Sequence, residues 1–302
     1  MQHIPKIVIT GGPCSGKTTA LAAIVQFCQD HGFYPVVIPE VATDLIVSGF
    51  DRMALSFQDF VTEKLLFEEA IRLRAVADGH LPQNTVLIYD RGLCDSEAYV
   101  GRAAFLEMLK RQDLSLVEAR DNYSGVICLD SAAVGAEEFY TTSNNTARTE
   151  GLAEARALNE RTKDAWMGSP HFKHVPNREG KDFDAKITEC LKALARILGV
   201  PEPIENERKF VVEDFCLDRL PTHCVPIDIV QTYLIGIEAG VERVRKRGQN
   251  GHQLYFHTVK IPHEGGGSVE VERFIDKQTY DELLLRKDST RNPIVKTRYC
   301  FR

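Results

Sequence analysis

The segment 11–18 constrains the fold of this 302-residue chain more than any other stretch of its sequence. Its letters, GGPCSGKT, fit the pattern G-x4-G-K-[ST], and they lie between the apolar segment 6–10 and a helical pattern at 17–31. Glycines let backbone N–H groups turn towards phosphate oxygens, and the start of a helix adds a favourable dipole. We therefore expect a phosphate-binding loop between a strand and a helix.

Two side chains of this loop have separate expected roles. Lys17 brings a positive charge to the β and γ phosphates, and the Thr18 hydroxyl is a ligand for Mg²⁺, with Mn²⁺ as the alternative. ATP and GTP both stay open, because the sequence has no N-K-x-D motif that would select guanine. The expected nucleotide-binding residues of the loop are Gly11, Gly12, Pro13, Cys14, Ser15, Gly16, Lys17, Thr18 and Thr19.

Strand and helix patterns alternate up to about residue 199. Apolar strand-like segments at 6–10, 34–39, 85–89, 125–129 and 172–175 are separated by helical patterns, chiefly at 17–31, 57–77, 148–166 and 182–198. This alternation predicts an α/β domain with a parallel, doubly wound sheet. The segment 199–203, GVPEP, is a natural boundary. We expect a P-loop NTPase or kinase-like domain over 1–199 and a second domain over 204–302.

Asp90 closes the apolar segment 85–89 and begins the stretch DRGLCD at 90–95. A carboxylate there holds a metal directly or through water, although an aspartate that caps the next helix fits the same position. The stretch D-R-G-x-x-D after this strand resembles P-loop kinases of the nucleoside and nucleotide type. The resemblance implies that Asp90, a catalytic residue and metal ligand, and Arg91, a nucleotide-binding residue, face the phosphates at the carboxyl edge of the sheet.

The same resemblance implies two further catalytic residues beside Lys17 and Asp90. Glu40 follows the strand-like segment 34–39, where such kinases often carry the general base for the acceptor; a helix-capping glutamate is the equal alternative. Arg148 follows a polar stretch at 137–146 that corresponds to the lid of such kinases. A solvated helix that also carries Arg156 and Arg161 is the competing interpretation.

Beyond residue 203 apolar and charged residues alternate. The pattern recurs at about 204–213, 227–237, 241–247, 254–261, 269–276 and 294–302, which predicts an antiparallel sheet or barrel. Several of these segments carry like charges at every second position, and hence on one strand face. A solvated face would mix the two signs. Acidic and basic strands that are segregated suggest an interior that holds a polyanion together with its metals.

The ordered series E-x-E-x-K, R-x-R-x-R, T-x-K, E-x-E and K-x-R resembles the CYTH superfamily, also called triphosphate tunnel metalloenzymes. The resemblance implies an α+β antiparallel tunnel domain in which Glu205 and Glu207 hold a divalent metal. The family pattern continues with two further acidic strands, so we expect a CYTH-like domain that is incomplete at its C-terminus and better suited to binding than to catalysis. The implied phosphate ligands are Lys209, Arg243, Arg245, Lys260, Lys296 and Arg298.

The first domain resembles AAA-like P-loop NTPases related to the nicotinamide riboside kinase domain, and its pairing with a CYTH-like domain resembles the TRPL translocation defect protein family. Three hypotheses follow. The chain is a P-loop NTPase or kinase whose second domain binds a phosphorylated ligand, or a GTP-dependent trafficking factor that binds phosphoinositides or other phospholipids. The third is a tunnel triphosphatase with a regulatory P-loop domain.

Composition limits the classes of binding partner and the cellular compartment that we expect for this protein. A formal net charge of −6 gives no general attraction to nucleic acid or anionic membranes, so peripheral membrane contact would need a local basic patch. No apolar run approaches the roughly 20 residues of a membrane span. The eight cysteines include no C-x-x-C pair and are more typical of reduced thiols than of a disulfide framework. We expect a cytoplasmic protein.

Overall fold

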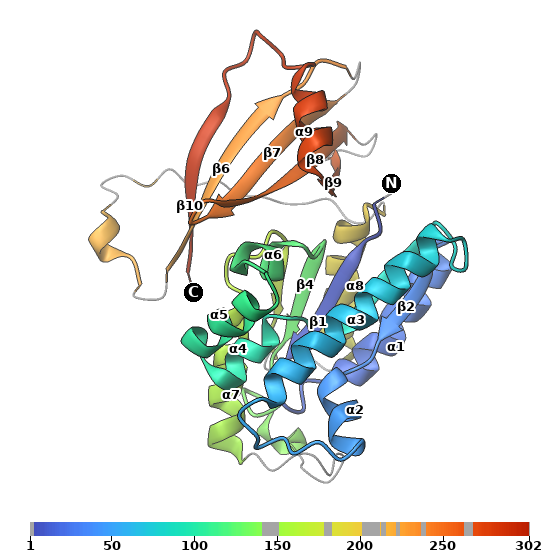
Figure 1. Cartoon of the computed structure of the whole chain (residues 1–302), viewed down its shortest axis with the longest axis vertical. Coiled ribbons are helices and arrows are strands. Elements are labelled where there is room, and N and C mark those ends of the chain that lie inside the picture. The colour runs from blue at the N-terminus through green and yellow to red at the C-terminus, as the bar shows by residue number, and fades with distance from the viewer. Residues whose placement is uncertain are drawn as a thin grey trace. The chain divides into compact units, whose positions relative to one another are not determined.

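The structure is a computed structural model that describes residues 3–140, 151–177, 183–200, 212, 216–221, 224–236, 240–262 and 268–301 (Figure 1). The chain forms two compact units, Met1–Leu194 and Ala195–Arg302. The limits expected from sequence, 1–199 and 204–302, put the boundary slightly later in the chain and stay predictions.

The first unit is built on a parallel five-stranded sheet in the order β2-β3-β1-β4-β5 (Figure 1). Every residue of β1 and β4 is buried, as expected for strands that are covered on both faces. The parallel α/β architecture predicted from the alternating pattern is confirmed. The strands are β1 (Lys6–Gly11), β2 (Tyr34–Ile38), β3 (Thr85–Asp90), β4 (Gly125–Leu129) and β5 (Phe172–Val175).

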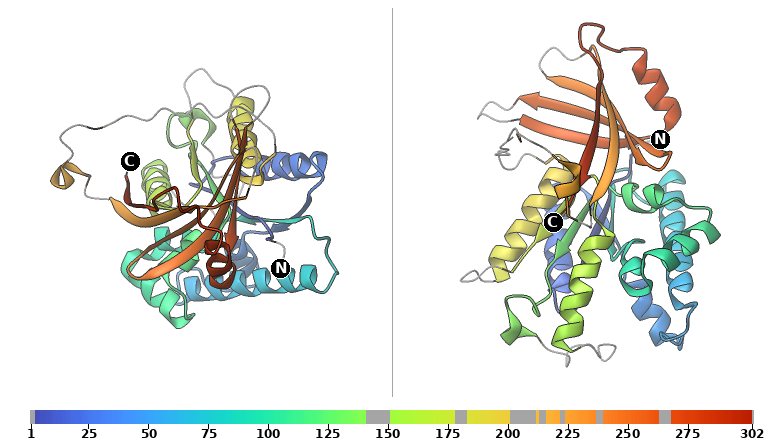
Figure 2. Two further views of the ribbon diagram at one scale, coloured as in Figure 1. Left: turned by 90° about the horizontal axis from the view of Figure 1, so that it is seen from above. Right: turned by 90° about the vertical axis from the view of Figure 1, so that its left-hand side faces the viewer.

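Helices cover both faces of this sheet, with α3 in front of it in Figure 1 and α1 and α8 behind it (Figures 1 and 2). The long helical patterns correspond to α1, α3, α7 and α8. The sequence pattern does not predict α2, α4, α5 and α6, three of which have only 6 or 7 residues. The helices are α1 (Lys17–Asp30), α2 (Val41–Val47), α3 (Phe57–Ala77), α4 (Asp95–Val100), α5 (Arg102–Arg111), α6 (Leu116–Asp121), α7 (Leu152–Ala165) and α8 (Phe183–Leu198), with a short 3₁₀ turn η1 (Glu137–Phe139).

The pleat of the sheet divides the core of the first unit into two layers. Val8 and Tyr89 belong to a cluster that gathers around the fully buried Trp166. Ile7 and Ile9 alternate with Val8 along β1, so they face the other side of the sheet, where they are also fully buried. Because both faces are apolar, polar side chains can gather only where the strands end.

The second unit contains an antiparallel five-stranded sheet in the order β10-β6-β7-β8-β9. Helix α9 packs on β7 and β8, where Tyr280 is buried against Val244 and its ring lies 4.8 Å from that of Tyr255. An antiparallel sheet was expected here, although the expected strand at 204–213 falls almost wholly outside the described residues. The elements are η2 (Leu217–Arg219), β6 (Val225–Tyr233), β7 (Val241–Gln249), β8 (His252–Pro262), β9 (Ser268–Ile275), α9 (Lys277–Leu284) and β10 (Ile294–Cys300).

Two further observations concern membrane spans and disulfides. Among the helices of the described residues, none is long and apolar enough to span a bilayer. In the same part of the chain no disulfide joins the cysteines.

Replacing Ile9 by alanine should destabilise the first unit by about 2–5 kcal/mol, because it leaves a cavity in the centre of a fully buried strand. Trp166 is the only tryptophan of the chain and is buried in this unit, so its fluorescence during urea unfolding reports the effect. Val37→Ala is the control, since Val37 lies on strand β2 with 37% of its surface exposed. Equal losses in the two variants would contradict the two-layer core.

Candidate functional site

Strand pairing places the phosphate loop between the ends of β3 and β4. Ile9 pairs with Asp90 on one side of β1, and Gly11 pairs with Leu129 on the other. Parallel strands end at the same edge of the sheet, so the residues that follow β3 and β4 flank the loop. The candidate site is therefore built from the connections that leave one edge of the sheet, after β1, β3 and β4, and Glu40 after β2 joins them.

The loop backbone has the conformation that the glycine pattern requires. Gly11 and Gly16 have φ angles of +146° and +84°, which residues with side chains rarely adopt. A Cβ atom on Gly11 would lie 2.1 Å from the carbonyl oxygen of Leu129. Helix α1 begins directly after this turn at Lys17, so its unbonded N–H groups are available to an anion.

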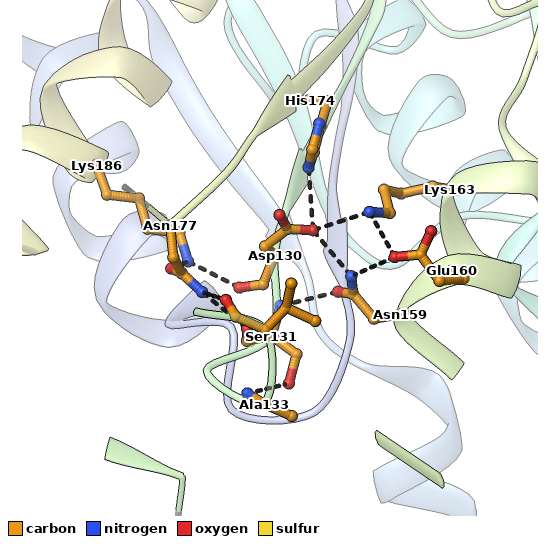
Figure 3. Close-up of polar contacts among 10 residues, drawn as sticks. Asp130, Ser131, Ala133, Asn159, Glu160, Lys163, His174, Asn177 and Lys186 are labelled. Carbon is orange, nitrogen blue, oxygen red and sulfur yellow. Dashed lines mark hydrogen bonds and ion pairs between the residues drawn. The ribbon is translucent and has the colours of Figure 1, made fainter. Parts of the chain in front are cut away.

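A buried lysine from α8 fastens the loop from behind (Figure 3). The Lys186 ammonium donates to the carbonyl oxygens of Ser15 at 3.0 Å and Asp130 at 2.8 Å, and to Oδ1 of Asn177 at 2.7 Å. Burial lowers the pKa of Lys186 to about 8, so the group is still protonated at neutral pH. Its three hydrogens match the three acceptors, and the lysine thereby ties the loop to the ends of β4 and β5.

Asp130 and Ser131 continue this polar network towards α7 (Figure 3). The Asp130 carboxylate lies 3.0 Å from His174 Nε2 and 3.2 Å from the Lys163 ammonium, and it accepts from Asn159 at 2.8 Å. Burial alone would raise the pKa of Asp130, but the hydrogen bonds from His174 and Asn159 bring it down to about 2. Asn159 also accepts from the Ser131 amide, at 2.8 Å, so the network fixes backbone as well as side chains.

On the other side of the loop, the side chain of Arg91 makes hydrogen bonds to three neighbouring residues. Its guanidinium donates to Glu40 at 2.6 Å, to the Gly11 carbonyl at 3.1 Å and to Asp95 at 3.4 Å. Arg91 has a φ of +73°, an uncommon conformation for a residue with a side chain and one that recurs at functional sites. Asp95 is itself held by the Gly92 amide at 2.8 Å and the Trp166 indole at 3.2 Å.

Glu40 and Lys17 both line the cavity beside the loop, and the charge of each shifts the pKa of the other. Burial would raise the pKa of Glu40, but Arg91 and Lys17 lower it to about 2, so the carboxylate is ionised at neutral pH. Burial lowers the pKa of Lys17, and the positive charge of Arg91 adds to that shift. Glu40 follows β2 and is the N-cap residue of α2, where its side chain makes no capping hydrogen bond, and Lys17 is the first residue of α1. The catalytic roles of both residues stay predictions.

Asp90 has the features of a metal ligand. Its Oδ1 is buried without a hydrogen-bond partner among the described residues, and burial raises the pKa of this carboxyl group. Among the described residues no group of three or more His, Cys, Asp or Glu could hold an ion by itself. The donor set therefore fits Mg²⁺, which needs only one or two protein ligands beside water and phosphate oxygens. Asp90 and the exposed Thr18 hydroxyl would hold it.

A cavity of about 630 Å³ opens beside these groups. Its walls come from the loop, from α2 and α3, and from α4, α5 and α7, and this volume is typical of a small-molecule site. Basic and acidic side chains balance along the walls: Lys17, Arg52, Arg91 and Arg161 against Glu40, Asp90, Asp95 and Glu154.

The three arginines of the expected lid are Arg148, Arg156 and Arg161, and the structure describes the last two. Arg148 lies outside the described residues and stays a prediction. Arg156 donates to the Ala133 carbonyl at 2.6 Å and pairs with Glu137 at 2.7 Å. Arg161 lines the cavity and donates to the Ala98 carbonyl at 2.8 Å. The sequence did not single out Lys186, which carries no motif and reaches the loop only through the packing of α8.

The charged side chains of β7, β8 and β9 that the sequence pattern singles out point to the same face of the sheet in the second unit. Arg243 is paired with Thr258 on β8, which is paired with Glu272 on β9, and residues opposite each other point to the same side. Arg243 lies 2.5 Å from Glu270, and Arg245 lies 2.8 Å from Glu272.

The basic residues of this face differ in their surroundings. Lys260 lies 3.5 Å from Glu270, whereas Lys296 and Arg298 on β10 are exposed. Burial lowers the pKa of Arg245, and Arg243 and Arg298 contribute to the shift. Glu205, Glu207 and Lys209, the remaining expected ligands, lie outside the described residues.

Comparison with known proteins bears on the first unit. A family model described as AAA domain matches residues 6–181, more than half of the chain. The match includes the phosphate loop and the elements that carry Glu40, Asp90 and Arg91, and it ends before α8. No curated protein matches the sequence significantly.

Lys186→Met should weaken nucleotide binding by about tenfold, which corresponds to about 1.4 kcal/mol, because the loop loses its tie to β4 and β5. The buried carbonyls left without a donor should also lower the free energy of unfolding by about 1–3 kcal/mol. Titration with Mg·ATP and Mg·GTP and urea unfolding would measure the two effects. Lys192→Met, on the exposed part of α8, is the control, and equal behaviour of both variants would refute the bracing role.

Proposed function

The chain belongs to the AAA domain family through residues 6–181, and we propose that it is a Mg²⁺-dependent phosphotransferase that moves the γ-phosphate of ATP or GTP to a hydroxyl-bearing acceptor. Membership of this family, together with the P-loop, supports nucleotide binding by the first unit. The single observation that carries the transfer step is the cavity whose wall contains Lys17, Glu40, Asp90 and Arg91 together. A second substrate in this cavity would meet the phosphate chain at its reactive end.

Each charged group has a distinct part in this reaction. The loop amides and Lys17 bind the phosphates and offset the charge that develops on the transferred group. Asp90 and Thr18 would hold Mg²⁺, which supplies further charge neutralisation when bound. Arg91 holds Glu40 and Asp95 in place through hydrogen bonds at 2.6 and 3.4 Å.

Glu40 would act mainly by orienting the acceptor. A carboxylate with a pKa of about 2 is a weak base, but it accepts a hydrogen bond from a hydroxyl group efficiently. In the transfer, the acceptor oxygen forms a bond to the γ-phosphorus while the bond from that phosphorus to the bridging oxygen breaks. The hydroxyl proton passes to Glu40 late in the step, as suits a loose transition state. With water as acceptor the same groups would give an NTPase.

Glu40→Gln should reduce phosphoryl transfer by about 10²–10⁴-fold while the nucleotide dissociation constant stays nearly unchanged. The amide keeps the size of the side chain but loses the negative charge that holds the acceptor hydroxyl. Product analysis with γ-labelled ATP and GTP, together with nucleotide titration, separates the two quantities. Lys17→Ala is the contrasting variant and should lose nucleotide binding as well. Full activity of Glu40→Gln would argue against this role.

A second candidate function is favoured by the charged face of the second unit: nucleotide-dependent binding of a phosphorylated ligand, such as a phosphoinositide headgroup. The Nε atoms of Arg243 and Arg245 are buried and have no hydrogen-bond partner among the described residues. An anion that accepted from both would satisfy them. Glu270 and Glu272 beside them would favour an anion that arrives with a divalent cation.

Arg243→Ala combined with Arg245→Ala should weaken binding of inorganic tripolyphosphate, and of vesicles that contain phosphoinositides, by at least about tenfold, because two charge-assisted hydrogen bonds are lost. Nucleotide affinity should not change. Lys246→Ala with Arg273→Ala is the matched control, because it removes the same charge from the opposite face of the sheet. Equal losses in both double variants would point to general charge attraction and would refute a site on this face.

A further inference from the structure

The cavity of the first unit has two chemically different parts. Lys17, Glu40 and Asp90 form its charged end, next to the phosphate loop. The wall formed by α2 and α3 is mainly apolar: beside Thr43 and Gln58 it contains Ile46, Val61 and Leu65 as well as Val41 and Phe57, which are only 5% and 4% exposed. A ligand that fills the cavity is therefore best matched by one polar end and a mainly apolar body, because most of this wall offers no hydrogen-bond partner to a buried hydroxyl.

The apolar wall continues to the surface of the unit. Met53 and Leu55, in the connection between α2 and α3, line the cavity and are 78% and 101% exposed. Large apolar side chains gathered at the mouth of a cavity are typical of a binding surface rather than of ordinary protein surface. A compact acceptor would occupy only the inner part of the cavity, whereas an extended apolar chain would also cover these two residues.

The charges of the cavity do not favour an anionic acceptor. Its basic and acidic side chains are equal in number, and Arg91 is already bonded to Glu40 and Asp95. A phosphorylated or carboxylated acceptor would find no excess of positive charge to compensate the loss of its hydration.

We propose that the acceptor is an uncharged alcohol with an extended apolar body, of the long-chain alcohol or lipid class. Its hydroxyl group contacts Glu40, its chain follows Val41 and Phe57, and its far end covers Met53 and Leu55. The inference rests on the proposed phosphotransferase function. The products are the phosphate monoester of the alcohol and a nucleoside diphosphate, and the hydroxyl proton leaves through Glu40.

A series of soluble alcohols tests this acceptor class on the full chain. Phosphoryl transfer from γ-labelled ATP or GTP with Mg²⁺ is measured for ethanol, 1-butanol and 1-octanol, with glycerol as a hydroxyl-rich comparison. Burial of each added CH₂ should raise kcat/KM by up to about fourfold, so octanol should exceed both ethanol and glycerol by more than tenfold. A better rate with glycerol, or no dependence on chain length, would overturn the inference and leave the phosphotransferase in place.

Two variants locate the effect at the mouth of the cavity. Met53→Ser with Leu55→Ser should reduce kcat/KM for octanol by about tenfold and leave ethanol unaffected, since only the longer chain reaches these residues. Both side chains are exposed, so folding should be preserved. Val47→Ser is the matched control, because Val47 is 81% exposed on α2 but does not line the cavity. An unchanged octanol preference in the double variant would overturn the proposed path of the chain.

Binding distinguishes failure of this inference from failure of the proposed function. Octanol is titrated calorimetrically into the protein with Mg²⁺ and a non-hydrolysable ATP or GTP analogue. Binding that is weakened by Met53→Ser with Leu55→Ser, without transfer to any alcohol, would refute the phosphotransferase and keep the cavity as a site for such molecules. Octanol binding no tighter than that of glycerol would refute the inference itself.

Discussion

The candidate site of the first unit depends on the position of strand β1, which lies between β3 and β4 in the sheet. Parallel pairing puts Ile9 beside Asp90 and Gly11 beside Leu129, so the phosphate loop leaves the sheet with Asp90 and Arg91 on one flank and Asp130 and Ser131 on the other. Since the strands are buried on both faces, this edge is where their polar residues can gather. That register places the phosphate loop next to the polar residues of both flanks.

The two flanks of the loop serve different purposes. Behind it, Lys186 and Asp130 are satisfied by neighbouring backbone and side chains, which suits a rigid support. In front of it, Asp90 keeps a carboxylate oxygen without a hydrogen-bond partner among the described residues, and Arg91 holds an uncommon backbone conformation. Unsatisfied or strained groups of this kind are costly for stability, and these two lie where the proposed function places the nucleotide, its metal and the acceptor.

In the second unit, charged residues lie on a face of the sheet and not only at the ends of its strands. Its sheet carries arginines and glutamates on one face, where the partly buried Arg243 and Arg245 each have a carboxylate beside them, at 2.5 and 2.8 Å. Such pairing offsets the cost of removing the charges from water, but it does not by itself favour folding. Binding of an anion together with a cation on this face belongs to the second candidate function that we propose.

The sequence alone determined the local chemistry: the loop 11–18, the alternating elements of a parallel sheet, and charged residues at strand ends such as Glu40 and Asp90. These depend on short-range rules of glycine conformation and hydrophobic period, which operate within about a dozen residues. The sequence could not give the short helices α2, α4 and α6, the bracing by Lys186, or the cavity with Met53 and Leu55 at its mouth. Those depend on how α8 packs behind the loop and how α2 and α3 face α4 and α5. Contacts between segments far apart in the chain are decided only by tertiary packing.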